Sequence, residues 1–258
     1  MTFRIAPGAN HLDYETFCRL NEACFPHEPV SPHEYQAFIT AAFWTVTHQD
    51  QPVGYAVLSH HQDRAHIRRI GIHPAYRRQG LGQQLMQAML DKAALLGATR
   101  IDLAVQQDNP IAIQLYRNFG FQVVGESVQF SLPIPPPAAG YDAIPVDEYP
   151  GQEELIKTQA GSHAPPHRWV LVFVQGDTFL GFTRFSPTYP GCSPFEIFED
   201  APPVDILALV STLGAYAQPG KETIKITTGN PKAITLFKAA DTVENYSLFH
   251  MSLALISE

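Results

Sequence analysis

The segment Arg77-Arg78-Gln79-Gly80-Leu81-Gly82 constrains this chain more than any other part of its sequence. A strand-like run, residues 67–72, precedes it, and a helix-like run, residues 83–96, follows it. Two glycines allow the backbone to turn tightly and to come close to a ligand. The N-terminus of the helix presents unpaired N–H groups and the positive end of the helix dipole. The segment therefore predicts an anion site suited to a phosphate or a pyrophosphate.

Other interpretations of this loop fit its residues less well. A P-loop requires Gly-Lys followed by Ser or Thr, whereas Gln83 and Gln84 follow Gly82. A Rossmann fingerprint requires a third glycine or an alanine where this chain has Leu85. The structural alternative is a glycine turn that carries solvated arginines on its surface.

The composition narrows the class of protein and of partner. A chain of 258 residues suits two medium domains or one large one, and its 45% hydrophobic content is that of a globular protein. A net charge of −8 argues against general nucleic-acid binding and is compatible with a cationic, amine-bearing substrate. A local basic cluster interrupts this acidic background, and it consists of Arg64, Arg68, Arg69, Arg77 and Arg78.

The cysteines and the hydrophobic runs bear on the cellular location. Cys18, Cys24 and Cys192 are odd in number and lack metal-binding spacing, so reduced thiols in a cytoplasmic protein are expected. The N-terminus has no apolar signal region, and no apolar run approaches the roughly 18 residues of a membrane span.

Periodicity and turn residues predict an alternating order of strands and helices in the first half. Asn109-Pro110 is an orthodox helix start, with Asn as cap and Pro as first residue. The Pro- and Ala-rich segment 133–145 is typical of a linker. The expected strands are residues 3–5, 43–47, 53–59, 67–72, 101–105, 121–124 and 128–132, and the expected helices are residues 12–24, 31–39, 83–96 and 109–119.

Two motifs at fixed spacing make residues 1–132 resemble the GCN5-related N-acetyltransferase (GNAT) superfamily. The first runs from Arg69-Ile70-Gly71-Ile72 through Gly82, and the second combines Asn109-Pro110 with Tyr116 and Phe119-Gly120-Phe121. The resemblance implies an α/β (α+β) fold with a mixed central sheet of the acyl-CoA N-acyltransferase type. It also implies acetyl-CoA as the acetyl donor.

The resemblance assigns the cofactor contacts to particular residues. The backbone N–H groups of Arg77, Arg78, Gln79, Gly80, Leu81, Gly82 and Gln83 would hold the pyrophosphate. The backbone of Ile70, Gly71 and Ile72 would pair with the pantetheine arm, as an added strand does. Asn109 would contact the pantetheine region, and its alternative role is a plain helix cap. The thioester would lie in a gap between the strands at residues 67–72 and 101–105.

Acetyl transfer requires a neutral amine, a polarised carbonyl and a proton for the leaving thiolate. Tyr116 occupies the position of the family's general acid, and a phenol stays protonated at neutral pH. The backbone N–H of Ile72 is the candidate that polarises the carbonyl. The alternative for Tyr116 is a core aromatic residue.

The general base is less well defined by the sequence. Peptide acetyltransferases of the family have a Glu where this chain has Ala104. Counting eleven residues back from Arg77, as in the histone acetyltransferases, gives His66. An imidazole is a competent base at neutral pH, although a surface histidine is an equal alternative. The neighbouring histidines have poor metal-site spacing, so no metal is expected.

Acceptor contacts in the family usually come from the first interhelical loop and the third strand. Here those residues are Phe25, His27, Glu28 and Tyr55. Glu28 is a candidate to attract an ammonium group, and a solvated loop with a packed Phe is the alternative. The expected partner is an amine acceptor, and the expected state is a monomer or a homodimer.

The second half repeats the pattern of the first. Residues 109–116 match residues 230–237, with Phe237 in place of Tyr116, and residues 50–59 match residues 177–186. Residues 146–258 are therefore predicted to be a second GNAT-like unit in tandem. The glycine loop aligns with residues 198–203, whose two prolines lack N–H donors and whose two carboxylates repel phosphate. This unit is not expected to bind CoA.

Three functions compete at this level. The first is transfer of acetyl from acetyl-CoA to a small amine or a peptide N-terminus through a ternary complex. The second is a non-catalytic, acyl-CoA-responsive binding protein, which the missing Glu at Ala104 leaves open, although the intact Tyr116 favours the first. The third is acetylation of protein lysines, which requires an open groove beside Glu28 and Tyr55.

Overall fold

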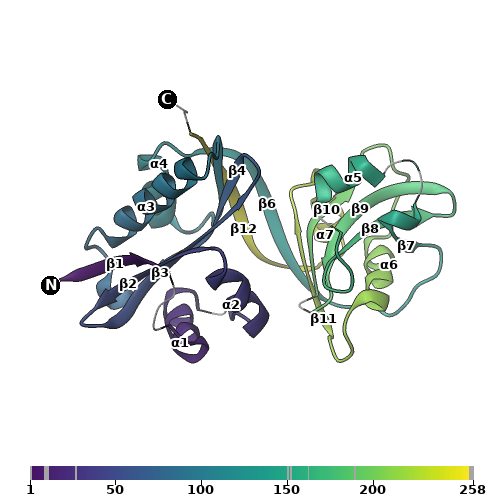
Figure 1. Cartoon of the computed structure of the whole chain (residues 1–258). Coiled ribbons are helices and arrows are strands. Elements are labelled where there is room, and N and C mark those ends of the chain that lie inside the picture. The colour runs from purple at the N-terminus through teal and green to yellow at the C-terminus, as the bar shows by residue number, and fades with distance from the viewer. Residues whose placement is uncertain are drawn as a thin grey trace. The chain divides into compact units, whose positions relative to one another are not determined.

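The computed structural model divides the chain into two compact units (Figure 1). It describes residues 2–8, 12–26, 28–149, 151, 153–161, 163–188 and 190–255. The first unit contains Met1–Val105, Asn109–Val124 and His250–Glu258, and the second contains Gln106–Asp108 and Gly125–Phe249. Each unit is described separately below.

The first unit is a mixed sheet with helices on both faces. Its strand order is β1-β2-β3-β4-β5, and the C-terminal end of β12 follows β5. β4 and β5 are parallel, whereas the pairs from β1 to β4 are antiparallel. Its elements are β1 (Phe3–Pro7), α1 (Tyr14–Cys24), α2 (Pro32–Ile39), β2 (Ala42–His48), β3 (Gln51–His61), β4 (Arg64–Ile72), a short 3-10 helix (Pro74–Tyr76), α3 (Leu81–Leu95), β5 (Arg100–Gln106) and α4 (Pro110–Asn118).

The helix starts of the first unit follow from their capping residues. Asp13 accepts a hydrogen bond from the Thr16 N–H, and Ser31 forms a capping box with Glu34. Asn109 caps α4 by accepting from the Ala112 N–H. α1 and α2 then cover one face of the sheet and α3 and α4 the other (Figure 1). Aromatic side chains fill the core under α1 and α2, among them Phe17, Tyr35, Phe38, Phe43 and Tyr55.

The second unit repeats this layout with shorter helices. Its strand order is β6-β11-β10-β9-β8-β7, with only β10 and β11 parallel among the described pairs. Its elements are β6 (Gln122–Pro133), β7 (Asp142–Pro145), a 3-10 helix (Val146–Glu148), α5 (Glu153–Ala160), β8 (Trp169–Gln175), β9 (Thr178–Ser186), β10 (Gly191–Ile197), α6 (Ile206–Ser211), a 3-10 helix (Thr212–Tyr216), β11 (Thr223–Thr228), α7 (Pro231–Ala239) and β12 (Val243–Ala254).

The long strands β6 and β12 each belong to both units. Residues 125–132, which the sequence pattern assigns to the first domain, lie in the second unit, where β6 pairs with β11. Residues 250–254 of β12 lie in the first unit, where β12 is next to β5. The expected strands 121–124 and 128–132 are one strand, Gln122–Pro133. β7 lies inside the expected linker 133–145.

Among the helices of the described residues, each is too short or too polar to cross a bilayer.

Candidate functional site

The glycine loop forms a nest of backbone N–H groups in the first unit. Arg78 and Gly80 both have positive φ, 60° and 75°. Gly80 is the N-cap of α3 and supplies no side-chain hydrogen bond. The first bond into the helix runs from the Gln84 N–H to the Gly80 carbonyl, 3.1 Å. Among the described residues, the N–H groups of positions 81–83 have no acceptor, so they are available to an anion.

A gap opens between β4 and β5 on the N-terminal side of this loop. The described pairing of the two strands ends at Ile67 and Leu103. The His73 N–H donates to the Val53 carbonyl on β3, 2.8 Å. The backbone N–H and C=O groups of consecutive residues in a strand point to opposite edges of that strand. The backbone groups of Ile70 and Ile72 therefore face the gap. An extended ligand can hydrogen-bond to this edge as a strand does.

One backbone group on this edge already has a partner. The Arg77 Nε donates to the carbonyl of Ile72, 3.0 Å. The carbonyl of Ile72 is thus shared with the loop, while its N–H still faces the gap. This arrangement suits a role for the N–H as a donor to a carbonyl oxygen.

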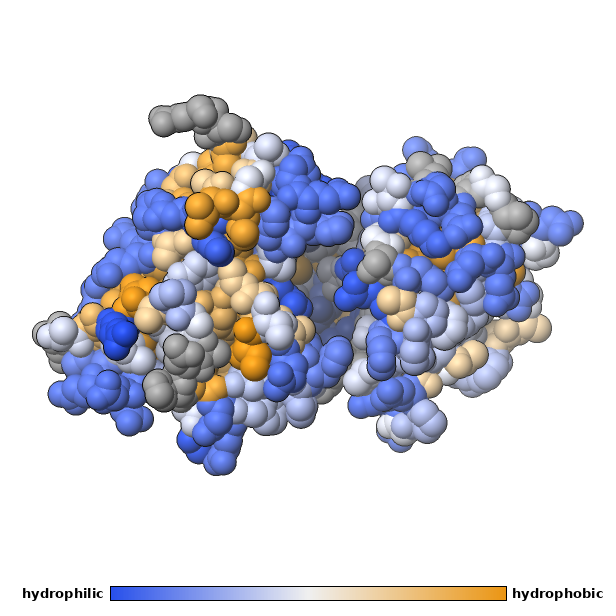
Figure 2. All heavy atoms as spheres, viewed as in Figure 1, coloured by the Kyte–Doolittle hydropathy of each residue, from blue (hydrophilic) through white to orange (hydrophobic). Residues whose placement is uncertain are grey.

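α4 lies beside the glycine loop. A Cβ on Gly82 would come within 3.6 Å of the Leu115 side chain, which brings α3 and α4 together at this point. A hollow of about 450 Å³ follows, lined by Gln83, Pro110, Ile111, Gln114, Leu115 and Asn118. Ile111 is 83% exposed. Figure 2 shows patches of apolar surface on the first unit, whose exposed apolar residues include Leu95 and Leu96 at the C-terminal end of α3 and Ile111 in α4.

Tyr116 projects from α4 into the interior. It is 6% exposed and packs against Phe121, with ring centroids 6.0 Å apart. Among the described residues its hydroxyl makes no hydrogen bond. Burial raises the pKa of Tyr116 to about 12, so the phenol is protonated at every pH at which the protein would be assayed. It is a proton donor without a competing partner.

His66 lies on β4 next to Asp102 of β5. The two residues are Cα partners, and Ser59 of β3 is the partner of His66 on its other side. His66 is exposed to solvent, yet the surrounding protein lowers its pKa, chiefly by desolvation. A lowered pKa leaves the imidazole neutral at pH 7. A neutral imidazole accepts protons.

The residues predicted to contact the acceptor lie in different environments in the structure. Tyr55 is fully buried, and its hydroxyl donates to the Asn21 Oδ1, 2.6 Å. Tyr55 is therefore a core residue and cannot contact a substrate, which corrects the expectation. The pattern of β3 missed this because burial on both faces of a strand depends on the helices that cover it. His27 lies outside the described residues.

Glu28 forms an ion pair with Arg69, which the sequence did not predict. The Arg69 Nη1 lies 3.3 Å from the Glu28 Oε2 and donates to Asn21, 3.2 Å. The same guanidinium lies over the ring of Phe25, 4.9 Å from its centroid. Arg68 lies over Phe38 of α2 at 4.7 Å. The face of β4 under α1 and α2 is thus rich in arginine, and the carboxylate of Glu28 is partly neutralised.

Comparison with known proteins identifies the first unit. The model of the Acetyltransferase (GNAT) family matches residues 14–121. The first unit belongs to the GNAT family. N-alpha-acetyltransferase RimI of Mycobacterium tuberculosis is 34% identical over 107 residues, which are 40% of this chain and 61% of that protein. The matched segments cover from 19% to 61% of the length of the curated relatives.

Solved structures match the fold of the whole chain. A tandem GNAT protein from the clavulanic acid biosynthesis pathway has a TM-score of 0.65 and 15% identity, and the match covers 100% of both chains. A GCN5-related N-acetyltransferase from Sphaerobacter thermophilus has a TM-score of 0.71 and 16% identity over 98% of this chain and 95% of that one. The prediction of a mixed α/β fold with two GNAT-like units in tandem is confirmed at the level of the fold.

The second GNAT unit can be aligned with the first through equivalent hydrogen bonds. The Phe198 N–H donates to the Leu180 carbonyl, 2.9 Å, as the His73 N–H does to that of Val53. Both α3 and α6 begin eight residues after this donor. Asp205 is then the counterpart of Gly80. The sequence predicts residues 198–203 as the counterpart of the glycine loop, and this segment begins four residues before the true counterpart. The prediction applies the residue offset between α4 and α7, and the offset between the two loops is four residues larger.

In the second unit, side chains of the same unit bond to the backbone groups that correspond to the predicted cofactor contacts of the first unit. The Asp205 carboxylate accepts from the Leu207 and Ala208 N–H groups, 3.0 and 3.1 Å, the counterparts of those of Gly82 and Gln83. The Asn230 Nδ2 donates to the Ile197 carbonyl, 2.9 Å, the counterpart of Ile72. A negative charge stands where the first unit offers N–H groups to a phosphate.

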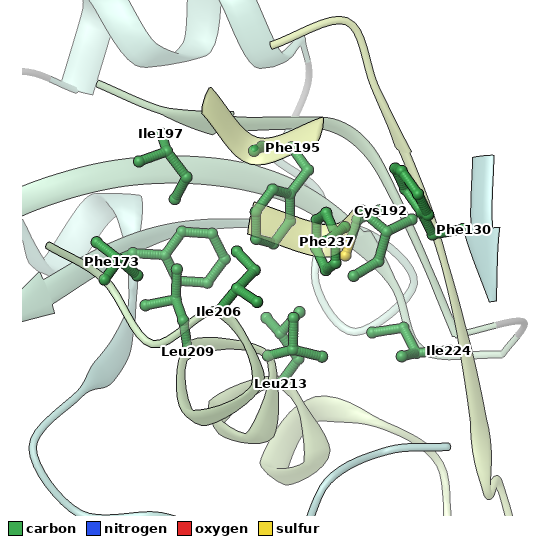
Figure 3. Close-up of a cluster of buried hydrophobic side chains, with 14 of the residues drawn as sticks. Phe130, Phe173, Cys192, Phe195, Ile197, Ile206, Leu209, Leu213, Ile224 and Phe237 are labelled. Carbon is green, nitrogen blue, oxygen red and sulfur yellow. The ribbon is translucent and has the colours of Figure 1, made fainter. Parts of the chain in front are cut away.

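Aromatic rings fill the interior of the second unit. Phe237, the counterpart of Tyr116, is fully buried and stacks on Phe130, with centroids 5.1 Å apart. Phe195 packs against the edge of Phe237 at 5.4 Å. Figure 3 shows these three rings turned toward one another from β6, β10 and α7. The position equivalent to the Tyr116 side chain is therefore part of a closed core in the second unit.

Lys232 of α7 hydrogen-bonds to the loop that precedes α6 in the second unit. Its Nζ donates to the carbonyls of Phe198, Glu199 and Ala201, at 3.1, 3.1 and 2.6 Å. Its counterpart in the first unit is the exposed Ile111. Three carbonyls converging on one ammonium hold the loop to α7 without a ligand.

Replacement of Lys232 by Met is expected to destabilise the second unit by about 2 kcal/mol, because three carbonyls lose a charged donor. Lys238→Met is the matched control on the same helix. Lys238 pairs with Glu244 at 3.3 Å on the surface, and its loss should cost less than about 0.5 kcal/mol. Urea unfolding followed by Trp169 fluorescence in a Trp44→Phe background measures this unit. Equal midpoints for both variants would contradict the role of Lys232.

Proposed function

We propose that the protein is an N-acetyltransferase that transfers acetyl from acetyl-CoA to a primary amine, with its single active site in the first unit. The observation that supports this most strongly is the contrast between the units. The first has uncapped N–H groups at α3 and a tyrosine at position 116, whereas the second has the Asp205 carboxylate on the equivalent N–H groups and Phe237 in place of the tyrosine.

Acetyl-CoA fits the residues of the first unit. The nest from Arg77 to Gln83 would hold its pyrophosphate, and the gap-facing edge at residues 70–72 would pair with its pantetheine amides. Asn109 and the hollow beside α4 lie next to this path. The thioester would then lie toward the point where β4 and β5 meet.

Each step of the transfer has a residue to support it. His66 accepts the proton of the acceptor ammonium and frees its lone pair, which attacks the thioester carbon. The Ile72 N–H donates to the oxygen that becomes negative. When the C–S bond breaks, the Tyr116 hydroxyl gives its proton to the thiolate. The nitrogen of the new amide loses its second proton to solvent, and the phenolate takes a proton back from solvent.

The acceptor is proposed to be a small amine or a peptide N-terminus. The similarity to an N-alpha-acetyltransferase over 107 residues favours the second of these classes. Phe25 and the Glu28–Arg69 pair would border the acceptor. Ala104, where related peptide acetyltransferases have Glu, favours one alternative, a binding protein that responds to acyl-CoA without turnover.

A screen of amines and peptides with acetyl-CoA tests the proposal. Each reaction is followed by chromatography of free CoA and by mass spectrometry of the acceptor, which must gain one acetyl group. We expect turnover with at least one class of primary amine. Saturable acetyl-CoA binding with no acetylated product in any class would instead establish the binding protein.

A further inference from the structure

The pair His66–Asp102 lies where β4 and β5 separate. It is the last pair on its face of the sheet, because Ile67 and Leu103, the final paired residues, are buried on the other face. Side chains of paired residues on adjacent parallel strands project to the same side, with the strands about 5 Å apart. The imidazole and the carboxylate are therefore neighbours at the closed end of the gap.

The face that carries this pair is the one covered by α1 and α2. Gly71, further along β4, faces the same side, because a Cβ there would meet Phe25 and Cys24 at the end of α1. Asp102 and Ala104 share this face as residues i and i+2 of β5. A carboxylate thus stands one strand period before the position at which the peptide enzymes have Glu.

Other charges surround the pair. Asp102 lies 3.7 Å from the Arg64 Nη2 and 3.8 Å from the Arg100 Nε, distances typical of weak, partly solvated ion pairs. Arg68 on β4 and His250 on β12 also face His66 and oppose its protonation, whereas Asp102 favours it. On β3, the Ser59 hydroxyl donates to the His66 carbonyl, 3.3 Å. Asp102 is thus the one carboxylate among the described charges that act on His66.

We propose that Asp102 acts on His66 through its charge and that the two form the proton-accepting pair of the active site. The inference rests on the proposed function. The Asp102 carboxylate, next to His66 across the paired strands, stabilises the imidazolium that forms when His66 takes the ammonium proton. That proton then passes to solvent, and Tyr116 separately supplies the proton of the thiol.

Asp102→Asn tests the pair through the pH dependence. His66 must be neutral to accept a proton, so the acidic limb of kcat/KM follows its pKa. Removal of the carboxylate lowers the pKa, and the limb moves to lower pH by about half a unit or more. NMR titration of His66 should show the same shift, with acetyl-CoA affinity unchanged. Asp102→Glu should restore the limb, and Asp91→Asn on α3 is the control that leaves it in place.

The outcomes separate this inference from the proposed function. Turnover with an unmoved limb and an unmoved His66 titration in Asp102→Asn would overturn the pair and leave the acetyltransferase intact. A wild-type protein that acetylates no amine would overturn the proposed function and the catalytic pair together. A limb that moves equally in Asp91→Asn would show a general charge effect and also overturn it.

Discussion

Replacement of Tyr116 by Phe is expected to lower kcat by a factor of about 10² to 10³, while the Kd of acetyl-CoA changes less than about twofold. In the proposed mechanism this hydroxyl protonates the leaving thiolate, and it makes no hydrogen bond among the described residues that its removal would break. The ring keeps its contact with Phe121, so the fold and the hollow beside α4 remain. Steady-state turnover and calorimetric titration measure the two quantities.

Tyr76→Phe is the matched control for this substitution. Tyr76 lies in the 3-10 helix before the glycine loop, and its ring packs edge-on against Phe3. We expect its kcat within twofold of the wild type. If the Tyr116→Phe protein is equally active, solvent protonates the thiolate and Tyr116 is a core residue without a catalytic role.

The pKa of Tyr116 adds a test on the wild-type protein. Burial raises this pKa to about 12, and the acid is active in its protonated form. Activity should therefore show no basic limb due to this residue up to pH 10, where an ordinary phenol is half ionised. A limb between pH 8 and 10 that disappears in Tyr116→Phe would place the phenol in a different environment.

Local chemistry explains which parts of the site were predictable from the sequence. Gly80 has the positive φ that a tight turn requires, and Asn109-Pro110 starts a helix by its own side chains. Both signals act within a few residues. The repeat of Asn109 to Tyr116 in residues 230–237 also needs no tertiary information.

Pairing between distant strands explains what the sequence did not predict. The neighbourhood of His66 and Asp102 depends on the register of β4 against β5, and neither side chain carries a local sign of it. The pairing of Glu28 with Arg69 depends on how α1 packs on the sheet. The place of residues 250–254 next to β5 depends on which sheet edge is open, and a strand pattern alone does not specify its partner.

Replacement of Gly80 by Asp is expected to weaken acetyl-CoA binding by a factor of about a hundred or more. The substitution brings to this position the residue of the second unit, in which Asp205 has an extended backbone, φ −77°, and its carboxylate accepts from the N–H groups of the helix start. In the first unit the new carboxylate would compete with the pyrophosphate for the same donors. Two like charges in a partly desolvated site repel by several kcal/mol.

Gly80→Asn is the control that separates charge from shape. Gly80 has a φ of 75°, which both Asn and Asp tolerate better than other side chains, so the two variants share the backbone cost. Asn lacks the charge, and we expect it to bind within about tenfold of the wild type. Calorimetric titration of the full chain should give one equivalent of acetyl-CoA for the wild type and none for Gly80→Asp in the same concentration range.

The stoichiometry of this titration also reports on the second unit. Because Asp205, Asn230 and Lys232 already occupy its donors and acceptors, no second equivalent should remain when the first site is blocked. A saturable equivalent in Gly80→Asp would show that these internal contacts open for the cofactor. Equal affinities for the Asp and Asn variants would mean that the N–H groups of α3 do not hold the phosphates, and the path of the cofactor along β4 would have to start elsewhere.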